Sequence, residues 1–187
     1  PSTDIEKTDE LMNTLTTDTT TDRMMVEVLY YSPWQFTGLT EDASWGTMFY
    51  YWVADYHSTT DSSRNATWGE EDYLNATFDL MKTKFVDKGI PVILGEFGPM
   101  RRSSLTGDDL TLHLDSRAFH LKYVVQQAKV YGLLPFYWDN GGIDNHSSGI
   151  FNRSDNTVFD QQALTALKKE LINMNKCKSL MKKRTFL

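Results

Sequence analysis

Three side chains that could do chemistry stand at the ends of three short apolar runs: Tyr31, Glu96 and Trp138. A carboxylate can carry catalysis, a tyrosine hydroxyl can hydrogen-bond it, and an indole offers a flat face to a ring-shaped ligand. In folds built of parallel βα units, ligands bind beyond the carboxyl ends of the strands. The three residues therefore predict one polar patch with an aromatic floor.

Glu96 is the sharpest of these signals, because Gly95 and Gly98 flank it and let the backbone approach a ligand closely. The alternatives are a turn or capping glutamate at Glu96, a packed tyrosine at Tyr31 and a core tryptophan at Trp138. Glu27 lies on the same side of its strand as Tyr31, and a buried carboxylate there is more often structural and paired.

The elements that must position these side chains follow from the hydrophobic pattern. Apolar spacing and turn residues predict helices and strands in alternation, which is typical of a parallel α/β fold. The expected helices are 5–15, 70–88, 115–131 and 160–171, and the expected strands are 24–31, 90–94 and 133–138. Between 32 and 69 lies a long irregular stretch that holds four tryptophans, with short helical turns expected around Trp45 to Ala54. Loops of this length in compact domains are usually functional.

Length and charge exclude several classes of protein. The 187 residues are 40% hydrophobic, enough for a core, whereas a complete (β/α)₈ barrel usually needs about 250 residues. The formal net charge of −6 disfavours a nucleic-acid partner. Residues 1–10 show no signal-peptide pattern, and no apolar run is long enough to span a membrane.

The sequence offers no sign of a cofactor or metal site. Cys177 is the single cysteine, the four histidines are scattered, and no phosphate-binding or dinucleotide-binding glycine motif is present. We therefore expect neither a cofactor nor a bound metal.

Four motifs, taken together and in order, resemble the C-terminal part of glycoside hydrolase family 5, and within it the bacterial endo-β-1,4-glucanases. They are VEVLYYSPWQF (26–36), WGTMFYYW (45–52), PVILGEFG (91–98) and FYWDNGG (136–142). The resemblance implies about strands six to eight of a (β/α)₈ TIM barrel, with a partial catalytic domain over residues 1–171 and a basic tail over 172–187.

The resemblance also implies a function: hydrolysis of β-1,4-linked glucans with retention, by a secreted or cell-surface enzyme. Glu96 matches the family's nucleophile and Tyr31 the tyrosine that hydrogen-bonds it. Trp138 matches the platform under the sugar at the cleavage point, and Trp34 and Trp45 resemble residues along the cleft.

Two departures from the family pattern matter. Leu29 stands where the family usually has a histidine, and leucine cannot hydrogen-bond. The acid/base glutamate of the family follows an earlier strand, so we expect this chain to be a fragment without it, with Glu27 and Asp139 as the nearby substitutes. Open barrel edges could then promote self-association. The alternatives are a non-catalytic glycan-binding remnant and an inactive truncated fragment.

Overall fold

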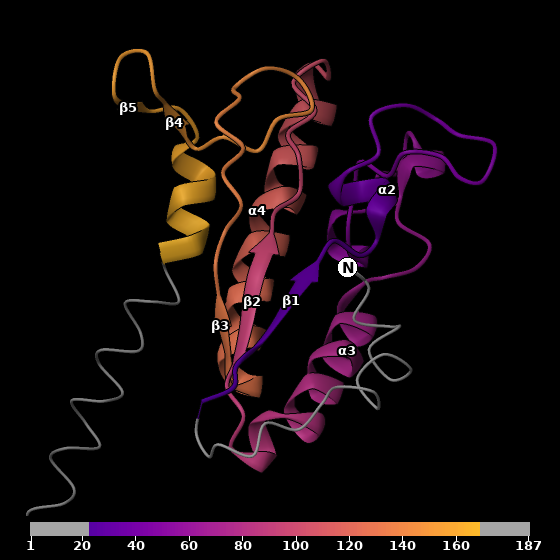
Figure 1. Cartoon of the computed structure of the whole chain (residues 1–187). Coiled ribbons are helices and arrows are strands. Elements are labelled where there is room, and N and C mark those ends of the chain that lie inside the picture. Colours follow the sequence, from indigo (N-terminus) through magenta and orange to yellow (C-terminus); the bar gives the residue numbers. More distant parts are fainter. Residues whose placement is uncertain (1–22, 169–187) are drawn as a thin grey trace, which may run out of the picture.

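A computed structural model of the protein describes residues 23–168, and its centre is a sheet of three parallel strands. The strands are β1 (Val26–Tyr30), β2 (Val92–Phe97) and β3 (Leu133–Pro135), in the spatial order β1-β2-β3 (Figure 1). The predicted parallel α/β arrangement is confirmed. The helix expected over 5–15, Cys177 and the boundary between residues 1–171 and the tail 172–187 lie outside the described residues.

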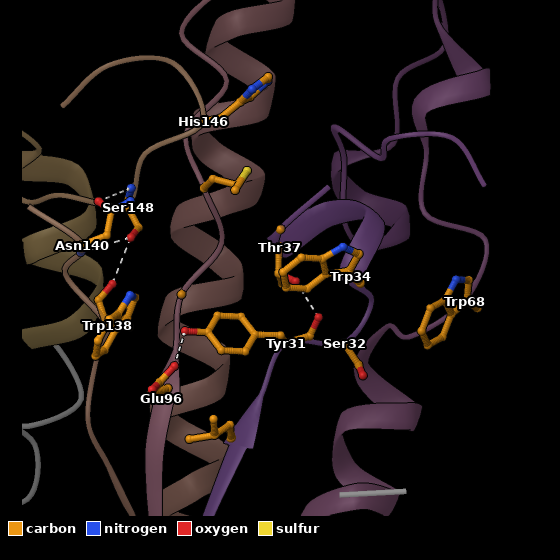
Figure 2. Close-up of a pocket in the computed structure, with 14 residues that line it drawn as sticks. Tyr31, Ser32, Trp34, Thr37, Trp68, Glu96, Trp138, Asn140, His146 and Ser148 are labelled. Atoms are coloured by element: carbon orange, nitrogen blue, oxygen red, sulfur yellow. Dashed lines mark hydrogen bonds between the residues drawn. The ribbon is translucent and has the colours of Figure 1, made fainter. Parts of the chain in front are cut away.

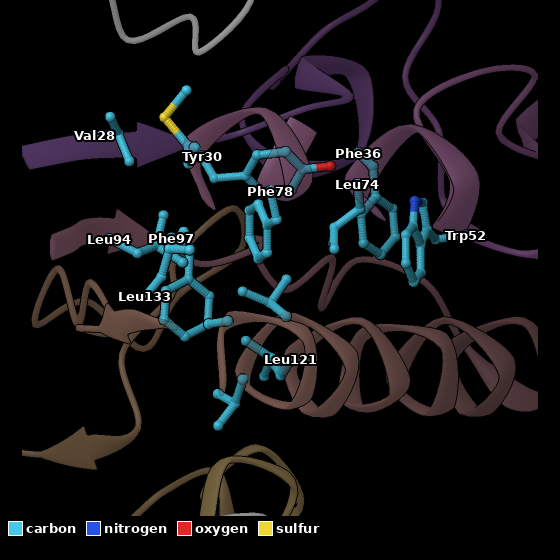
Figure 3. Close-up of a cluster of buried hydrophobic side chains, with 14 of the residues drawn as sticks. Val28, Tyr30, Phe36, Trp52, Leu74, Phe78, Leu94, Phe97, Leu121 and Leu133 are labelled. Atoms are coloured by element: carbon cyan, nitrogen blue, oxygen red, sulfur yellow. The ribbon is translucent and has the colours of Figure 1, made fainter. Parts of the chain in front are cut away.

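Two long helices, α3 (Glu71–Lys84) and α4 (Gly107–Tyr131), pack on one face of the sheet. Figure 3 shows sheet residues such as Tyr30 and Leu94 meeting Phe78 of α3 and Leu121 of α4 in a single apolar core. On the opposite face, Leu134, Phe136 and Trp138 are each at least half exposed. The helices therefore cover only one side of the sheet in the described part of the chain.

Several shorter elements complete the fold. The chain also forms α2 (Trp34–Thr37), the 3₁₀ turns η2 (Ala54–Tyr56), η3 (Ser62–Arg64) and η4 (Val86–Lys88), and the hairpin strands β4 (Phe151–Asn152) and β5 (Thr157–Val158). A last helix begins at residue 161 and is described to 168. Asp160 caps it as predicted, since its carboxylate accepts the Ala163 N–H at 2.9 Å.

The predicted start of α4 at Asp115 is wrong. The helix begins eight residues earlier, at Gly107, and its N-cap residue is Thr106. These eight residues resemble a loop because half of them are polar. All but His113 are exposed or half-exposed, and two aspartates in the first turn complement the helix dipole. Asp115 therefore lies within α4, away from its ends, and is exposed to solvent.

Other elements also differ from the sequence prediction: β1 spans Val26–Tyr30 instead of 24–31, β2 begins at Val92 instead of 90, and α3 ends at Lys84, before η4, instead of at 88. Residues 45–53 form no helical turn, because their backbone is held in extended contacts with the segment around Arg64. Strand β2 continues past Leu94 to Phe97. Strand β3 ends at Pro135 as a regular strand, although the N–H groups of Phe136 and Trp138 still donate to carbonyls of β2.

One buried guanidinium organises the irregular stretch after β1. Arg102 is only 1% exposed, and it donates to the carbonyls of Gln35 at 2.8 Å, Leu39 at 3.0 Å and Phe49 at 3.2 Å. Burial lowers the pKa of Arg102 to about 10, which still leaves the group charged at neutral pH. Because one side chain satisfies three separated carbonyls, it fixes the path of a segment that has little regular structure.

Acid is expected to destabilise the protein through two buried histidines of α4. Burial is the main reason that the pKa values of His113 and His120 fall to about 3, from 6.5 when exposed. The neutral His113 ring accepts the backbone N–H of Arg102 at 3.0 Å, and neither ring nitrogen of His120 has a hydrogen-bond partner among the described residues. Between pH 6.5 and about pH 3, the unfolded state binds more protons than the folded state. The contribution of the two histidines to the free energy of unfolding is therefore fully present above pH 6.5. It is lost as the pH falls, at up to ~1.4 kcal/mol per histidine per pH unit.

Urea unfolding at pH 7.0, 5.5 and 4.5 measures this effect. The His120→Leu variant serves as the control, because it removes one of the two titrating groups. Its unfolding free energy should fall less steeply with acidification than that of the parent. Equal slopes for the two proteins would contradict the assignment of His120.

Candidate active site

A cavity of about 640 Å³ opens at the carboxyl ends of the three strands. Figure 2 shows the cavity with Glu96 and Tyr31 at its centre, Trp138 on one side, and Trp34 and Trp68 on the other. Its lining residues are Leu29, Tyr31, Ser32, Trp34, Thr37, Gly38, Trp68, Glu96, Gly98, Met100, Trp138, Asn140, His146 and Ser148. The polar patch with aromatic walls that the strand ends predicted is therefore present as one cavity.

Glu96 faces this cavity because strand β2 carries an irregularity. The pairing of β1 with β2 shifts register by one residue between Val28, opposite Leu94, and Leu29, opposite Glu96. Strict alternation from the buried Leu94 would place Glu96 on the helix-covered face of the sheet. The extra residue, Gly95, restores Glu96 to the open face.

Tyr31 lies beside Glu96 and donates its phenolic hydrogen to Glu96 Oε2 at 3.0 Å (Figure 2). Burial, followed by the hydrogen bond to the carboxylate and its charge, raises the pKa of Tyr31 well above its ordinary value. The hydroxyl therefore stays protonated and donating throughout the neutral range. It holds one carboxylate oxygen and leaves the other available to a ligand.

Removing this hydroxyl is expected to slow chemistry at Glu96. A hydrogen bond to a charged group contributes ~1.5–3 kcal/mol, so Tyr31→Phe should lower the rate by roughly 10- to 100-fold. With the β-1,4-glucan substrate that the resemblance implies, the measurement is the rate of phenolate release from an activated aryl β-cellobioside. Tyr56→Phe, which alters a tyrosine outside the cavity, is the matched control, and an equal loss in both variants would argue against a local role of Tyr31.

Trp138 forms the opposite wall and is 50% exposed. Its backbone N–H donates to Phe97 O at 3.0 Å and its carbonyl accepts the Ser148 hydroxyl at 3.0 Å, so both ends of the residue are fixed. Because its indole is exposed, Trp138 is not part of the hydrophobic core that the described residues form. A fixed, open indole beside a carboxylate is suited to stacking on a flat ring.

Trp34 also lines the cavity, whereas Trp45 does not. The Trp34 indole meets the Tyr31 ring edge-on, at a centroid distance of 6.1 Å, and lies so close to Gly38 that a Cβ there would approach it to 2.3 Å. Trp45 sits in the turn between Ala43 and Gly46 and is highly exposed outside the cavity. The geometry therefore supports the prediction that Trp34 lies along the cleft. It does not support the same prediction for Trp45.

Several lining residues escaped the sequence prediction. Asn140 follows Trp138 closely, and its side chain accepts the N–H of Ser148 at 3.1 Å, which draws the loop containing His146 over the cavity. Trp68 comes from the irregular stretch before α3. Only the concentration of tryptophans in that stretch hinted at Trp68, and the polar loop residues carried no recognisable signal.

Comparison with known proteins decides the family. The family model described as cellulase, glycosyl hydrolase family 5, matches residues 5–144. The chain belongs to glycosyl hydrolase family 5. This membership and the solved structures below confirm that the chain is part of a (β/α)₈ barrel.

The relatives of this family 5 chain include two bacterial glucanases. Endoglucanase A of Paenibacillus barcinonensis is 38% identical over 147 residues, which cover 78% of this chain and 33% of that protein. The xyloglucan-specific endo-β-1,4-glucanase BoGH5A of Bacteroides ovatus is 31% identical over 162 residues, which cover 84% of this chain and 29% of that protein. The chain thus spans about a third of the length of these curated relatives.

Solved structures of family 5 enzymes are similar in fold. A xyloglucan-specific β-1,4-glucanase from a ruminal metagenomic library, in complex with XXLG, superposes with a TM-score of 0.76 at 32% identity, covering 92% of this chain and 44% of that one. A broad-specificity endoglucanase from Bacteroides salanitronis gives a TM-score of 0.70 at 34% identity, covering 90% of this chain and 41% of that one.

Leu29, where the resemblance implies a histidine, lines the same cavity as Glu96 and stands opposite it in the strand pairing. The side chain at this position beside the carboxylate is therefore apolar and offers no hydrogen bond. Tyr31 is left as the side chain that hydrogen-bonds Glu96 among the described residues.

Neither expected substitute for the family 5 acid is well placed. The two oxygens of Asp139 accept the N–H groups of Gly141 at 2.7 Å and Ile150 at 3.0 Å, so Asp139 organises its own loop. Glu27 is exposed and packs over Gly95, outside the cavity. Among the described residues that line the cavity, Glu96 is the one carboxylate.

The described residues hold no group of three or more His, Cys, Asp or Glu side chains that could bind a metal. None of the helices within residues 23–168 is long and apolar enough to cross a membrane.

Proposed function

We propose that the chain carries the nucleophile half of a retaining endo-β-1,4-glucanase site, with Glu96 as the nucleophile. The supporting observation is the Glu96 carboxylate in an aromatic-walled cavity, held by the Tyr31 hydroxyl at 3.0 Å. The names of the relatives, an endoglucanase and a xyloglucan-specific endo-β-1,4-glucanase, indicate β-1,4-glucans as the class of substrate.

In this proposal Trp138 supports the sugar ring while the free oxygen of Glu96 attacks its anomeric carbon. The glycosidic C–O bond breaks, the leaving oxygen takes a proton, and the sugar remains as an ester on Glu96. Water then cleaves the ester. Retaining enzymes use a second carboxyl group, about 5–5.5 Å from the nucleophile, to donate the proton and activate the water.

A substrate that needs no proton donor tests the nucleophile alone. The probe is a fluorinated β-cellobioside that carries dinitrophenolate as its leaving group. Dinitrophenolate departs without protonation, and the fluorine slows hydrolysis of the ester that forms on Glu96. Mass spectrometry of the labelled chain should find one added cellobiosyl group, on the peptide that contains Glu96. The Glu96→Gln variant should remain unlabelled, whereas Glu27→Gln, the matched carboxylate on the same sheet face, should label at the parent rate.

The alternative function is glycan binding without bond cleavage. It is favoured by the single carboxylate among the described lining residues, since retaining hydrolysis uses two. A chain that binds cello-oligosaccharides but accepts no label at Glu96 would establish this alternative. Labelling of Glu96 would exclude it.

We also propose that the protein acts outside the cell, where polymeric glucans occur.

We further propose that copies of the chain associate. Apolar residues on the open sheet face, such as Leu134 and Phe136, support this self-association. Light scattering over a range of protein concentrations measures it.

A further inference from the structure

The residue before Trp138 packs on the other side of the sheet. Trp138 is exposed in the cavity, whereas Tyr137 packs against the hydrophobic core, as the alternation of side chains along an extended segment requires. The Tyr137 ring meets Phe97 edge-on at a centroid distance of 5.8 Å, and a Cβ on Gly98 would approach that ring to 2.9 Å. Tyr137 thus contacts both of the residues that follow Glu96 in the chain.

The hydroxyl of Tyr137 joins the interior to the loop that follows Trp138. It accepts an N–H of the Arg117 guanidinium at 3.2 Å and donates to Ser148 O at 2.5 Å. Burial raises the pKa of Tyr137, so the hydroxyl keeps the proton that it donates. Arg117 is itself buried and ion-paired with Asp160 at 2.6 Å. The loop is therefore tied to a group that is fixed in the interior.

Ser148 closes this loop onto Trp138. Its hydroxyl donates to Trp138 O at 3.0 Å, and its N–H donates to Asn140 Oδ1 at 3.1 Å. Figure 2 shows Ser148 hydrogen-bonded to both residues. Ser148 is only 6% exposed, although it lines the cavity. One residue thus links the Tyr137 hydroxyl to the backbone of Trp138.

Close backbone contacts hold the rest of the loop. The Gly149 N–H donates to Gly142 O at 2.9 Å, and a Cβ on Gly149 would approach that oxygen to 2.2 Å. On another side of the loop, the Arg101 N–H donates to Ser147 O at 2.8 Å. Because the loop is held at several points, a shift of the Trp138 backbone would break hydrogen bonds within it.

We propose that Tyr137 is a positioning residue for Trp138: through Ser148, it holds the indole in the place where a sugar ring stacked on it faces Glu96. Misplacement of a reacting ring by about 1 Å can slow a reaction by about 10²-fold, so the support of the indole matters as much as its presence. This inference rests on the proposed function, because it takes the ring that Trp138 supports to be the sugar that reacts with Glu96.

Fluorine NMR of the full chain, with fluorotryptophan in place of tryptophan, tests the positioning. The chain has five tryptophans, and Trp138→Phe identifies the Trp138 signal by its loss. That signal should shift or broaden in Tyr137→Phe and in Ser148→Ala, because each variant breaks the link to the interior. Tyr123→Phe is the matched control: its hydroxyl accepts the Asn75 amide N–H at 2.8 Å, outside the cavity, and its removal should leave the Trp138 signal unchanged.

The rate at which the fluorinated cellobioside labels Glu96 measures the consequence for chemistry. At saturating probe, the rate constant should be about tenfold lower in Tyr137→Phe and in Ser148→Ala, and equal to that of the parent in Tyr123→Phe. A loss of stability alone would reduce the amount of labelled protein but leave this rate constant unchanged. Because Tyr137 acts through Ser148, the double variant should label within about twofold of Ser148→Ala. Losses that multiply in the double variant would contradict this route.

The two measurements separate this inference from the proposed function. A Trp138 signal unaffected by Tyr137→Phe, in a chain that accepts label at the parent rate, would overturn the positioning role and leave the function standing. A signal that moves in a chain that accepts no label would support the positioning role and overturn hydrolysis. A signal that moves equally in Tyr123→Phe would show a general loosening of the fold and overturn the role of Tyr137.

Discussion

Replacing Glu96 with glutamine is expected to lower reducing-sugar release from a soluble β-1,4-glucan by at least about 10³-fold. Glutamine keeps the size of the side chain and can still accept the Tyr31 hydrogen bond, but its amide oxygen is too weak a nucleophile to form the ester. Binding of cello-oligosaccharides should stay within about twofold of the parent affinity, since the aromatic walls are unchanged. Reducing-sugar assays and calorimetry on the same samples check both statements.

The control for this experiment is Glu27→Gln, which removes a carboxylate from the same sheet face outside the cavity. It should not alter release. Full activity of Glu96→Gln would refute the nucleophile assignment and move the search for chemistry elsewhere. If neither the parent nor Glu96→Gln releases sugar, label formation at Glu96 decides between a nucleophile that lacks its acid partner and a glycan-binding protein.

Replacing Asp160 with alanine is expected to reduce the free energy of unfolding by about 3–5 kcal/mol. Asp160 and Arg117 form an ion pair at 2.6 Å, with side chains 3% and 2% exposed, so alanine would leave an unpaired guanidinium in the interior. The change also removes the cap of the last helix at Ala163. Urea denaturation followed by circular dichroism measures the loss.

The same ion pair also supports the segments that carry Glu96 and Trp138. Arg117 also donates to Pro99 O at 2.8 Å, after β2, and to the Tyr137 hydroxyl at 3.2 Å, next to Trp138. Asp160→Asn keeps a cap acceptor but loses the charge, and it should cost less than alanine. Asp144→Ala, in an exposed loop, is the surface control and should change stability by no more than ~0.5 kcal/mol. A loss below about 1 kcal/mol for Asp160→Ala would show that the pair adds little.

The order of the elements was readable from the sequence because each relies on local chemistry. Apolar spacing marked α3 through Leu74, Phe78 and Met81, and β-branched runs marked β1 and β2. The start of α4 was misplaced because solvent-exposed polar turns of a long helix have the composition of a loop. Propensity and pattern do not separate those two cases.

By itself, the sequence determined which residues stand at the strand ends, and thus that Tyr31, Glu96 and Trp138 would meet at one edge of a parallel sheet. The resemblance carried by four motifs added the family. Both depend on short stretches of chain, where side-chain type and spacing are sufficient.

Only the tertiary structure decided which way those side chains point and what joins them. The register shift at Gly95 turns Glu96 into the cavity, and it depends on how β2 pairs with β1. Arg102 fixes the stretch after β1 through carbonyls far from it in sequence, and Gly69 against Pro33 brings Trp68 to the same cavity. Contacts between distant segments depend on the packing of the whole chain, so no local pattern encodes them.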